Sequence, residues 1–348
     1  MLWFIVKRLV WAICLAFVIS FFTFLIFFVV PSDTRANRQG GVTISLLQQY
    51  RLEHDSVFNA YGQFVWRFVR HGDLGRSFLN NQPVNEKVAA ALPVTLSLVV
   101  GGAFFWLLMA FPIAILSALR PRSLLDRAGM IFVLIGVSAH PVWIGLVFSY
   151  FLGYKLHLMP ISGYCDFLHP TGRVCGGTLD WFHHMLLPWL TFAFLFTALY
   201  TRMIRAMVLE QLQEDYVRTA RAKGAGEIRV LRTHVLRNSL LPVVTMLGMD
   251  VGLAFGGVLF VESVYDLPGV GGMLYDALTR GLDLPVMMGA FLIVCLAVVL
   301  ANLIADVACY ALDPRMHVVR VSSYARDARQ TPRLRRLLPK ARLSETAT

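Results

Sequence analysis

The chain has 348 residues, of which 57% are hydrophobic and only 15% are charged. A soluble domain usually carries about a quarter charged residues, so this composition excludes an ordinary soluble protein. The net charge of +11 does not indicate nucleic acid, because the basic residues gather in a few segments between long apolar blocks.

Six apolar blocks predict membrane spans, since a helix needs about 17–25 residues to cross a bilayer. The fourth block is the shortest, and we expect it to extend toward Ile204. The sequence therefore predicts an all-α integral membrane protein with six transmembrane helices. The blocks cover residues 9–30, 92–119, 129–153, 185–201, 240–261 and 285–311.

The charges between the blocks predict an orientation. If the N-terminus is inside, the inner segments hold 22 Lys and Arg against 8 acids, whereas the outer loops hold 10 against 11. Basic residues favour the cytoplasmic side, so we expect both termini in the cytoplasm. The inner segments are 1–8, 120–128, 202–239 and 312–348, and the outer loops are 31–91, 154–184 and 262–284.

This orientation divides the chain into three parts. Residues 1–91 are expected to form a first span and an extracytoplasmic region. The first block is too long for a signal peptide, whose apolar core has about 7–15 residues, so we expect it to remain uncleaved. Residues 92–311 would form a five-helix core with a cytoplasmic coupling loop at 208–239. The basic tail 312–348 would be disordered or lie on anionic lipid.

One helix is predicted outside the spans, and a kink is predicted inside one of them. Residues 44–70 predict a helix that carries Phe64, Val65, Phe68 and Val69 on one side, against the membrane or a partner. His140-Pro141 lies in the middle of the third block and predicts a kink. His140 could relay protons or simply bond a neighbouring helix.

The cysteines divide by location. Cys14, Cys295 and Cys309 lie in apolar blocks and are expected to pack there. Cys165 and Cys175 fall in one outer loop, where oxidising conditions allow a disulfide, although two free thiols remain an alternative. No zinc-binding spacing of Cys and His appears in the sequence.

Asp250 in the fifth block and Asp306 in the sixth place a carboxylate within apolar sequence. A charge in hydrocarbon is costly, so both should face protein or a water-filled path. Asp250 is therefore a candidate pathway residue or a buried structural acid. The surrounding glycines would allow close helix packing or leave room for a pore. They are Gly248, Gly252, Gly256 and Gly257.

Residues 215–242 form the most polar segment between two blocks and predict two short helices joined by a turn. Gly224 and Gly226 would end the first helix, and Glu227 would begin a second that runs to about Asn238. A basic, small-residue elbow suits a docking element, but a solvated loop explains the composition as well. Its basic and small side chains are Arg218, Thr219, Ala220, Arg221, Ala222 and Lys223.

Four motifs carry a resemblance to a known family. They are GDLGRSFLNNQPV at 72–84, DYVRTARAKGA at 215–225, Glu262 with Pro268-Gly269-Val270-Gly271 and then Asp283-Leu284-Pro285, and Asn302 and Asp306 with Asp313-Pro314-Arg315. From Met1 to about Arg315 the chain resembles the permease subunits of ABC importers in the dipeptide, oligopeptide and nickel group. Arg218 stands where the general coupling motif has Glu, as is common in the peptide group. Asp250 is not part of the family pattern.

The resemblance implies a type I permease fold in a bacterial or archaeal cell membrane. It implies a second, similar permease, two cytoplasmic ATPase subunits and an extracytoplasmic binding protein as partners. The chain has no GxxxxGK[ST] match, so we expect it not to be an enzyme and to hold no cofactor, with ATP and Mg on partner subunits.

The resemblance also assigns residues to sites. Tyr216, Val217, Ala220 and Gly224 would pack into an ATPase groove, and Arg218 and Arg221 would pair with its acids or with Glu214. Asp250 and Glu262 are the candidates for the substrate pathway. The full coupling set is Asp215, Tyr216, Val217, Arg218, Thr219, Ala220, Arg221, Ala222, Lys223 and Gly224.

Two other functions stay open beside the permease. An ion-coupled secondary transporter could use Asp250 and His140, but it often shows inverted repeats, and none is evident. A membrane enzyme or scaffold is the third alternative, and no nucleophile–base set supports catalysis. The substrate is open among dipeptides, oligopeptides, nickel chelates, haem and glycosides.

Overall fold

The computed structural model describes residues 2–29, 57–167, 177–280 and 283–312. These residues are almost entirely helical, which confirms the predicted all-α class. The elements are α1 (Leu2–Val29), α3 (Val57–His71), α4 (Val84–Leu119), α5 (Leu124–Ser138), α6 (Pro141–Phe148), the π-helix η2 (Ser149–Lys155), α7 (Thr178–Gln213), α8 (Asp215–Ala222), α9 (Glu227–Arg229), the π-helix η3 (Val230–Val235), α10 (Leu236–Tyr265), α11 (Val270–Thr279) and α12 (Leu284–Leu312).

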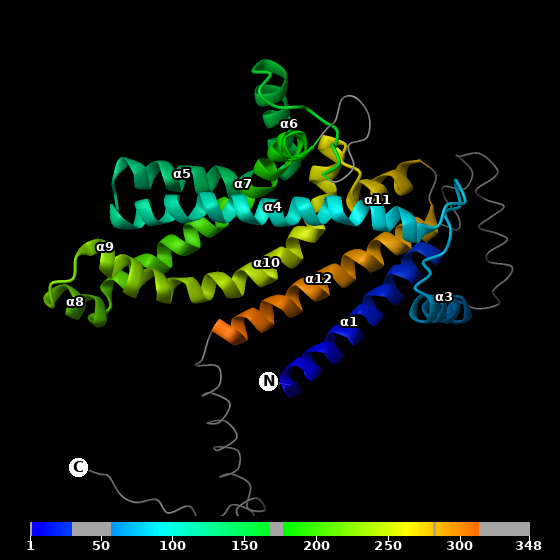
Figure 1. The fold of residues 1–348 in the computed structure, drawn as a ribbon, viewed down its shortest axis with the longest axis horizontal. Coiled ribbons are helices and arrows are strands. Elements are labelled where there is room, and N and C mark those ends of the chain that lie inside the picture. Colours follow the sequence, from blue (N-terminus) through cyan, green and yellow to red (C-terminus); the bar gives the residue numbers. More distant parts are fainter. Residues whose placement is uncertain (1, 30–56, 168–176, 281–282, 313–348) are drawn as a thin grey trace, which may run out of the picture.

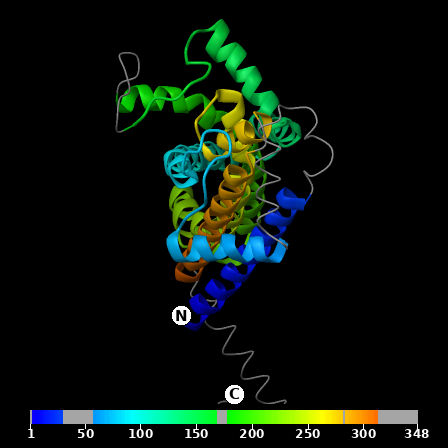
Figure 2. The same cartoon turned by 90° about the vertical axis from the view of Figure 1, so that its right-hand side faces the viewer.

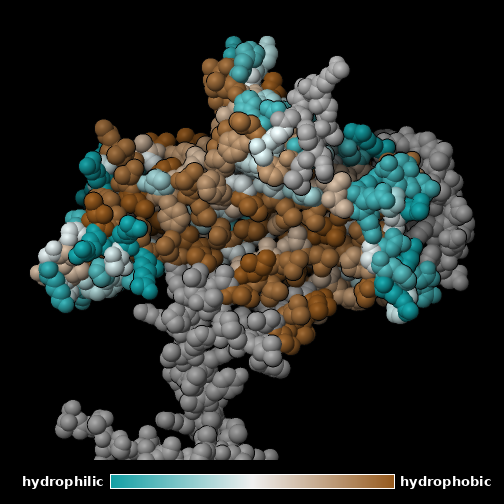
Figure 3. Space-filling model, viewed as in Figure 1, coloured by the Kyte–Doolittle hydropathy of each residue, from teal (hydrophilic) through white to brown (hydrophobic). Residues whose placement is uncertain are grey.

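The long helices lie lengthwise, and the short ones gather at the two ends. Figure 1 shows α8 and α9 at one end of the molecule and α3 and α11 at the other. Between these ends the surface is mostly hydrophobic, and both ends are hydrophilic (Figure 3). This distribution is typical of a protein whose long helices cross a bilayer.

Four helices are long and apolar enough to cross a membrane, and the bent pair of α5 with α6 and η2 makes up to five. In α1, the apolar segment Leu9–Leu25 is shorter. All six predicted blocks fall on helices, but length and composition support four or five spans. The four are Val84–Leu119, Thr178–Gln213, Pro242–Tyr265 and Leu284–Ala305.

The third block is broken, not merely kinked. Leu124–Ser138 and Pro141–Lys155 meet at 112°, and α6 projects from the long helices in Figure 1. Pro141 occupies the first turn of α6, where its missing N–H costs nothing, and it holds His140 in an extended conformation. His140 Nδ1 accepts from Val142 N at 3.3 Å. His140 therefore caps its own helix instead of bonding a neighbouring one.

The core lies between α4 and α7, where bare glycine backbone lets large aromatic side chains approach. A Cβ on Gly102 would lie 2.4 Å from Phe192 Cδ1. The Trp106 ring stacks on Phe196 with centroids 4.5 Å apart, and Trp189 Nε1 donates to the Ser97 carbonyl at 2.9 Å. These contacts fix the two longest helices side by side.

Two of the glycines around Asp250 allow the close helix packing that the sequence predicts, and a pore beside them stays a prediction. A Cβ on Gly248 would lie 2.0 Å from Ala305 Cβ, and one on Gly252 would lie 3.3 Å from Asn302 Oδ1. Both glycines therefore allow α10 to approach α12 closely. Gly256, by contrast, has open space beside it, and the exposed side chains of Met249, Leu253 and Phe260 continue the same uncovered side of α10.

Helix α3 lies across α1, as Figure 2 shows. Tyr61 fixes the crossing, because its hydroxyl bonds Ser20 Oγ at 2.8 Å and donates to the Phe17 carbonyl at 3.1 Å. Phe64 is buried here, with Val65 and Phe68 packed beside it. Val69 is 75% exposed, because it lies at the edge of this side, about 140° around the helix from Phe64.

Candidate functional site

Helix α8 rests on the ends of α7 and α10 through one buried side chain and one phenol. Val217 is fully buried in the core. The Tyr216 hydroxyl donates to Gln211 Oε1 and accepts from Asn238 Nδ2 at 3.2 Å. Val217 therefore faces this chain's own interior, and its expected contact with an ATPase groove is wrong in this structure.

Gly224 closes the turn after α8. Its φ of +82° is a conformation that glycine adopts without strain, and open space surrounds it. The next residue, Ala225, donates its N–H to the Ala220 carbonyl at 3.1 Å. The elbow therefore has the predicted geometry of a helix ended by Gly224.

Two exposed ion pairs hold the elbow together. The Arg221 guanidinium donates to both Glu227 oxygens at 2.8 and 3.0 Å, and these hydrogen bonds lower the pKa of Glu227. Arg218 lies 3.5 Å from Asp215. Neither arginine pairs with Glu214, so that expected pairing is wrong.

The outward face of α8 holds most of the predicted coupling residues. One residue that sequence reasoning missed extends it: Ile228, on α9, is 83% exposed. An isolated apolar residue in a polar segment was the available signal. The exposed side chains of the predicted set are Asp215, Tyr216, Arg218, Thr219, Arg221, Ala222 and Lys223, whereas Ala220 is partly buried.

No break separates the second helix of the elbow from the next span. Helix α9 passes through the π-helix Val230–Val235 directly into α10, so the predicted end near Asn238 is wrong. Pro242 lies inside α10. A displacement at α9 would therefore pass along one continuous helical run to Asp250.

A buried ion pair near the α8 end ties α4, α5 and α7 together. Arg205 donates to both oxygens of Asp126, at 2.8 and 2.9 Å, and to Ser117 Oγ at 2.9 Å. Asp126 also accepts from Arg122 N at 2.8 Å. Sequence reasoning missed this cluster, because its members are far apart in the chain and each resembled an ordinary charge at the end of a span.

At the opposite end, Glu262 joins α10 to α4 and to the first turn of α11. It is fully buried, and it accepts from Thr95 Oγ1 at 2.7 Å and from Gly272 N at 2.9 Å. Thr95 in turn accepts from Val270 N at 2.8 Å. The carboxylate therefore satisfies donors at the start of α11, a geometry that favours a positioning role over contact with substrate.

Asp283 does the same for the loop before α4. It is buried, and it accepts from Ser77 Oγ and, at 3.0 Å, from Phe78 N. Lys87 Nζ donates to Ser77 Oγ at 3.3 Å. Two motifs that lie 206 residues apart in sequence are thus joined by one carboxylate.

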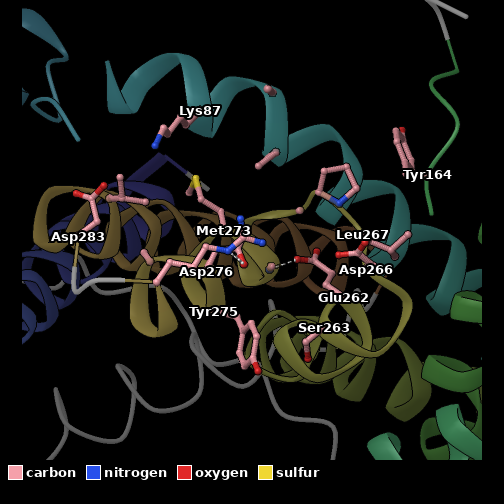
Figure 4. A pocket seen from close by; sticks show the side chains of 18 of the residues that line it. Lys87, Tyr164, Glu262, Ser263, Asp266, Leu267, Met273, Tyr275, Asp276 and Asp283 are labelled. Carbon is pink, nitrogen blue, oxygen red and sulfur yellow. Dashed lines mark hydrogen bonds and ion pairs between the residues drawn. The ribbon is translucent and has the colours of Figure 1, made fainter. Parts of the chain in front are cut away.

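Between these two carboxylates lies a cavity of about 930 Å³. Figure 4 shows Lys87 and Asp283 at one end and Asp266 at the other, with Met273 and Asp276 between them. Residues of α4, α10, α11 and the loop between α10 and α11 line most of the wall, and Gly163 and Tyr164 come from the loop after η2. Burial raises the pKa of the Tyr164 phenol.

Asp250 is partly buried on α10. Its carboxylate lies near the buried Tyr200 hydroxyl of α7. This places Asp250 at the contact of α7 with α10, and its place on the pathway stays a prediction. The side chain of Asp306 lies outside what the structure describes.

The remaining sequence candidates have mixed outcomes. Cys165 is disulfide-bonded, but its predicted partner Cys175 lies outside the described residues, as do Asp313-Pro314-Arg315 and the tail. In the described ranges no three His, Cys, Asp or Glu side chains gather as a metal site.

Comparison with known families gives matches over most of the chain. The family described as "Binding-protein-dependent transport system inner membrane component" matches residues 110–318. The family described as "Binding-prot-dependent transport system membrane comp, N-term" matches residues 1–99. Together they cover every motif on which the resemblance was based, and only residues 100–109, in the middle of α4, lie between the two matches.

Individual proteins are similar over nearly their whole length. The dipeptide transport system permease protein DppB of Escherichia coli K12 is 33% identical over 338 residues, covering 91% of this chain and 99% of the relative. A peptide transport system permease protein of Brucella suis is 32% identical over 317 residues, covering 90% and 98%.

A solved structure has the same fold. A chain of the MetNI methionine ABC transporter in inward-facing conformations superposes with a TM-score of 0.52 at 16% identity. The match covers 65% of this chain and 96% of that one.

Proposed function

Because the chain belongs to the family of binding-protein-dependent transport system inner membrane components, we propose that it forms part of the translocation pathway for peptides in an ATP-driven importer. As a permease subunit it is not an enzyme, and separate ATPase subunits hydrolyse ATP. The observation that carries the proposal is the elbow: α8 exposes a polar face and continues through α9 into a membrane-spanning helix.

The exposed side of the elbow is the proposed ATPase contact. Tyr216, Arg218 and Thr219 would contact the ATPase from α8, and Ile228 would add an apolar anchor from α9. Buried Val217 would transmit the displacement, because it packs α8 against the core. Closure and opening of the ATPases would then move α7 and α10 against the helices around them.

The partners and orientation follow from the same arrangement. We propose a heterodimer with a second permease, two ATPases that hold ATP and Mg, and an extracytoplasmic binding protein that delivers the peptide. Six spans with cytoplasmic termini would place α8 inside and α11 outside. The start of α1 and the end of α12 both point toward the α8 end (Figure 1), which supports this orientation.

Two further assignments complete the proposal. Asp250 would line the pathway beside Tyr200, where α7 meets α10. A Cys165–Cys175 disulfide would close the loop over residues 166–174 on the outer side, in line with the disulfide-bonded state of Cys165.

The test compares two equally exposed apolar residues. Ile228 on α9 and Leu124 on α5 are each 83% exposed. In the reconstituted transporter, Ile228→Ser should lower peptide-stimulated ATP hydrolysis and ATPase copurification about tenfold, the effect of losing a buried interface anchor. Leu124→Ser should leave both unchanged. ATPase binding and stimulation at the normal level in Ile228→Ser would contradict the docking assignment.

The runner-up function, a secondary transporter, makes the opposite prediction. It would move peptide without an ATPase, using an ion gradient and Asp250. Uptake by the chain without ATPase subunits, abolished by Asp250→Asn, would favour that function over an ATP-driven importer.

A further inference from the structure

The cavity at the α11 end carries two opposite charges that form no ion pair within the described residues. Glu262 and Asp283 also line it, but their carboxylates already accept hydrogen bonds from the protein. Asp276 pairs with Arg280 at 3.1 Å. Asp266 and Lys87 remain, and they lie at opposite ends of the cavity in Figure 4.

Asp266 is available to a ligand. Within the described residues its side chain makes no hydrogen bond or ion pair, and the residue is exposed at the cavity wall. Its φ of +51° is uncommon for any residue except glycine, asparagine and aspartate. Glycine would fit this turn with less strain, so the turn alone does not explain a carboxylate here.

Lys87 is available in the same way. Its only hydrogen bond within the described part of the chain is the 3.3 Å contact with Ser77 Oγ. An ammonium has three donors, so at least two can meet a ligand. Lys87 is half-buried on the first turn of α4, where the α4 backbone leaves further N–H groups unpaired.

The wall between these charges suits a short peptide. Met273, Tyr275 and Pro268 offer apolar surface there. Sites for small molecules have volumes of about 300–1,000 Å³ and combine apolar walls with a few placed polar groups. The cavity of about 930 Å³ fits that description.

We propose that this cavity is a transient receiving site for zwitterionic peptides, in which the Asp266 carboxylate binds the free amino terminus and the Lys87 ammonium binds the free carboxyl terminus. The site would select for unblocked peptide ends after the binding protein releases them. This inference rests on the proposed function, because it requires that peptides cross this subunit.

The test uses the complete transporter in proteoliposomes, with its binding protein, and three probes: trialanine, N-acetyl-trialanine and trialanine amide. The measured quantity is the initial rate of ATP-driven uptake. The N-acetyl penalty is the rate for trialanine divided by the rate for N-acetyl-trialanine, and the amide penalty is the same ratio for trialanine amide. The same binding protein serves every variant, so its own preference cancels when the penalties of variant and wild type are compared.

The two variants should have crossed effects. Asp266→Asn should reduce the N-acetyl penalty about fivefold, which is the factor expected for one partly solvated charge pair. It should leave the amide penalty unchanged. Lys87→Gln should do the reverse. Glu86→Gln is the matched control, because Glu86 is an exposed neighbour that does not line the cavity, and both of its penalties should equal those of the wild type.

Asp266→Gly separates the carboxylate from the turn. Glycine accepts the positive φ, so this variant should behave like Asp266→Asn if the carboxylate binds peptide. A wild-type pattern in Asp266→Gly would overturn the proposal.

Other outcomes are also decisive. Equal slowing of all three probes in a variant would indicate a structural role for that residue. Penalties equal to those of the wild type would indicate that there is no receiving site. Complete exclusion of a blocked peptide by every variant counts as the same result. Both would overturn this inference while leaving peptide transport intact. If the wild type takes up no peptide at all, the proposed function itself fails.

Discussion

The two polar ends of this molecule are built differently. At the α11 end, buried carboxylates of Glu262 and Asp283 accept hydrogen bonds from residues far away in sequence. At the α8 end, Arg221 and Glu227 form an exposed ion pair between neighbouring turns, and Val217 is the fully buried residue of α8. The α11 end is therefore held by buried hydrogen bonds between distant segments, whereas the α8 end is held by few buried contacts and is suited to move as a unit.

The Asp126–Arg205 ion pair marks where the movable part begins. It joins α4, α5 and α7 on the side of α8, and unlike the elbow it is largely buried. Removing one partner of a buried pair costs about 3–5 kcal/mol. The ion pair therefore holds these three helices together, and the last turns of α7 lead from it to α8.

The largest expected effect comes from adding a methyl group at the α11 end. A Cβ on Gly271 would lie 2.6 Å from Leu259 Cα and 2.9 Å from Leu259 N. Because these are backbone atoms, they cannot turn away, and Gly271→Ala should lower the free energy of unfolding by about 3 kcal/mol. Thermal unfolding of the purified permease in detergent measures it. An unchanged midpoint would show that this end is not rigid.

The next effect tests the buried carboxylate. In Glu262→Gln, the amide nitrogen cannot accept, so either Gly272 N or Thr95 Oγ1 loses its acceptor. An unsatisfied buried donor costs about 1–3 kcal/mol. The same unfolding measurement should show this loss, and uptake should fall with it. A stable Glu262→Gln with a specific uptake defect would instead return Glu262 to the pathway.

A smaller effect is expected at the α8 turn. Gly224→Ala adds a side chain in open space but at a φ of +82°, which costs about 1 kcal/mol. Gly224→Asn should cost less, because asparagine tolerates this conformation. Peptide-stimulated ATP hydrolysis should decrease in the order wild type, Asn, Ala. If Gly224→Ala lowered the free energy of unfolding as much as Gly271→Ala does, the two ends of the molecule would not differ in rigidity.

The smallest effect is expected from the Arg221–Glu227 pair. Arg221 lowers the pKa of Glu227 from its usual 4.5, so the pair contributes only above that pH and is lost as the pH falls through the lowered pKa. Between about pH 6 and pH 8 its contribution is constant. Glu227→Gln should therefore leave unfolding and ATP hydrolysis indistinguishable from wild type across this range. A pH-dependent difference there would show that the pair is not merely solvated.

The sequence predicted which residues matter better than it predicted how they are used. Gly224, Glu262 and Asp283 stood out because they belong to motifs with fixed spacing, but the motifs did not show that Glu262 and Asp283 are hydrogen-bonded inside the protein. Asp126 and Arg205 gave no motif at all. Ile228 was hidden because one apolar residue in a polar stretch carries little signal alone.

By itself, the sequence determined the all-α membrane class and an interruption of the third block at Pro141, which it predicted as a kink. Both depend on local properties, namely apolar length and a missing backbone donor. Only the tertiary structure decided that the third block bends by 112°, that Val217 faces inward and that α9 continues into α10. These depend on which side chains meet across the bundle, and contacts between residues distant in sequence leave no periodic pattern in the chain.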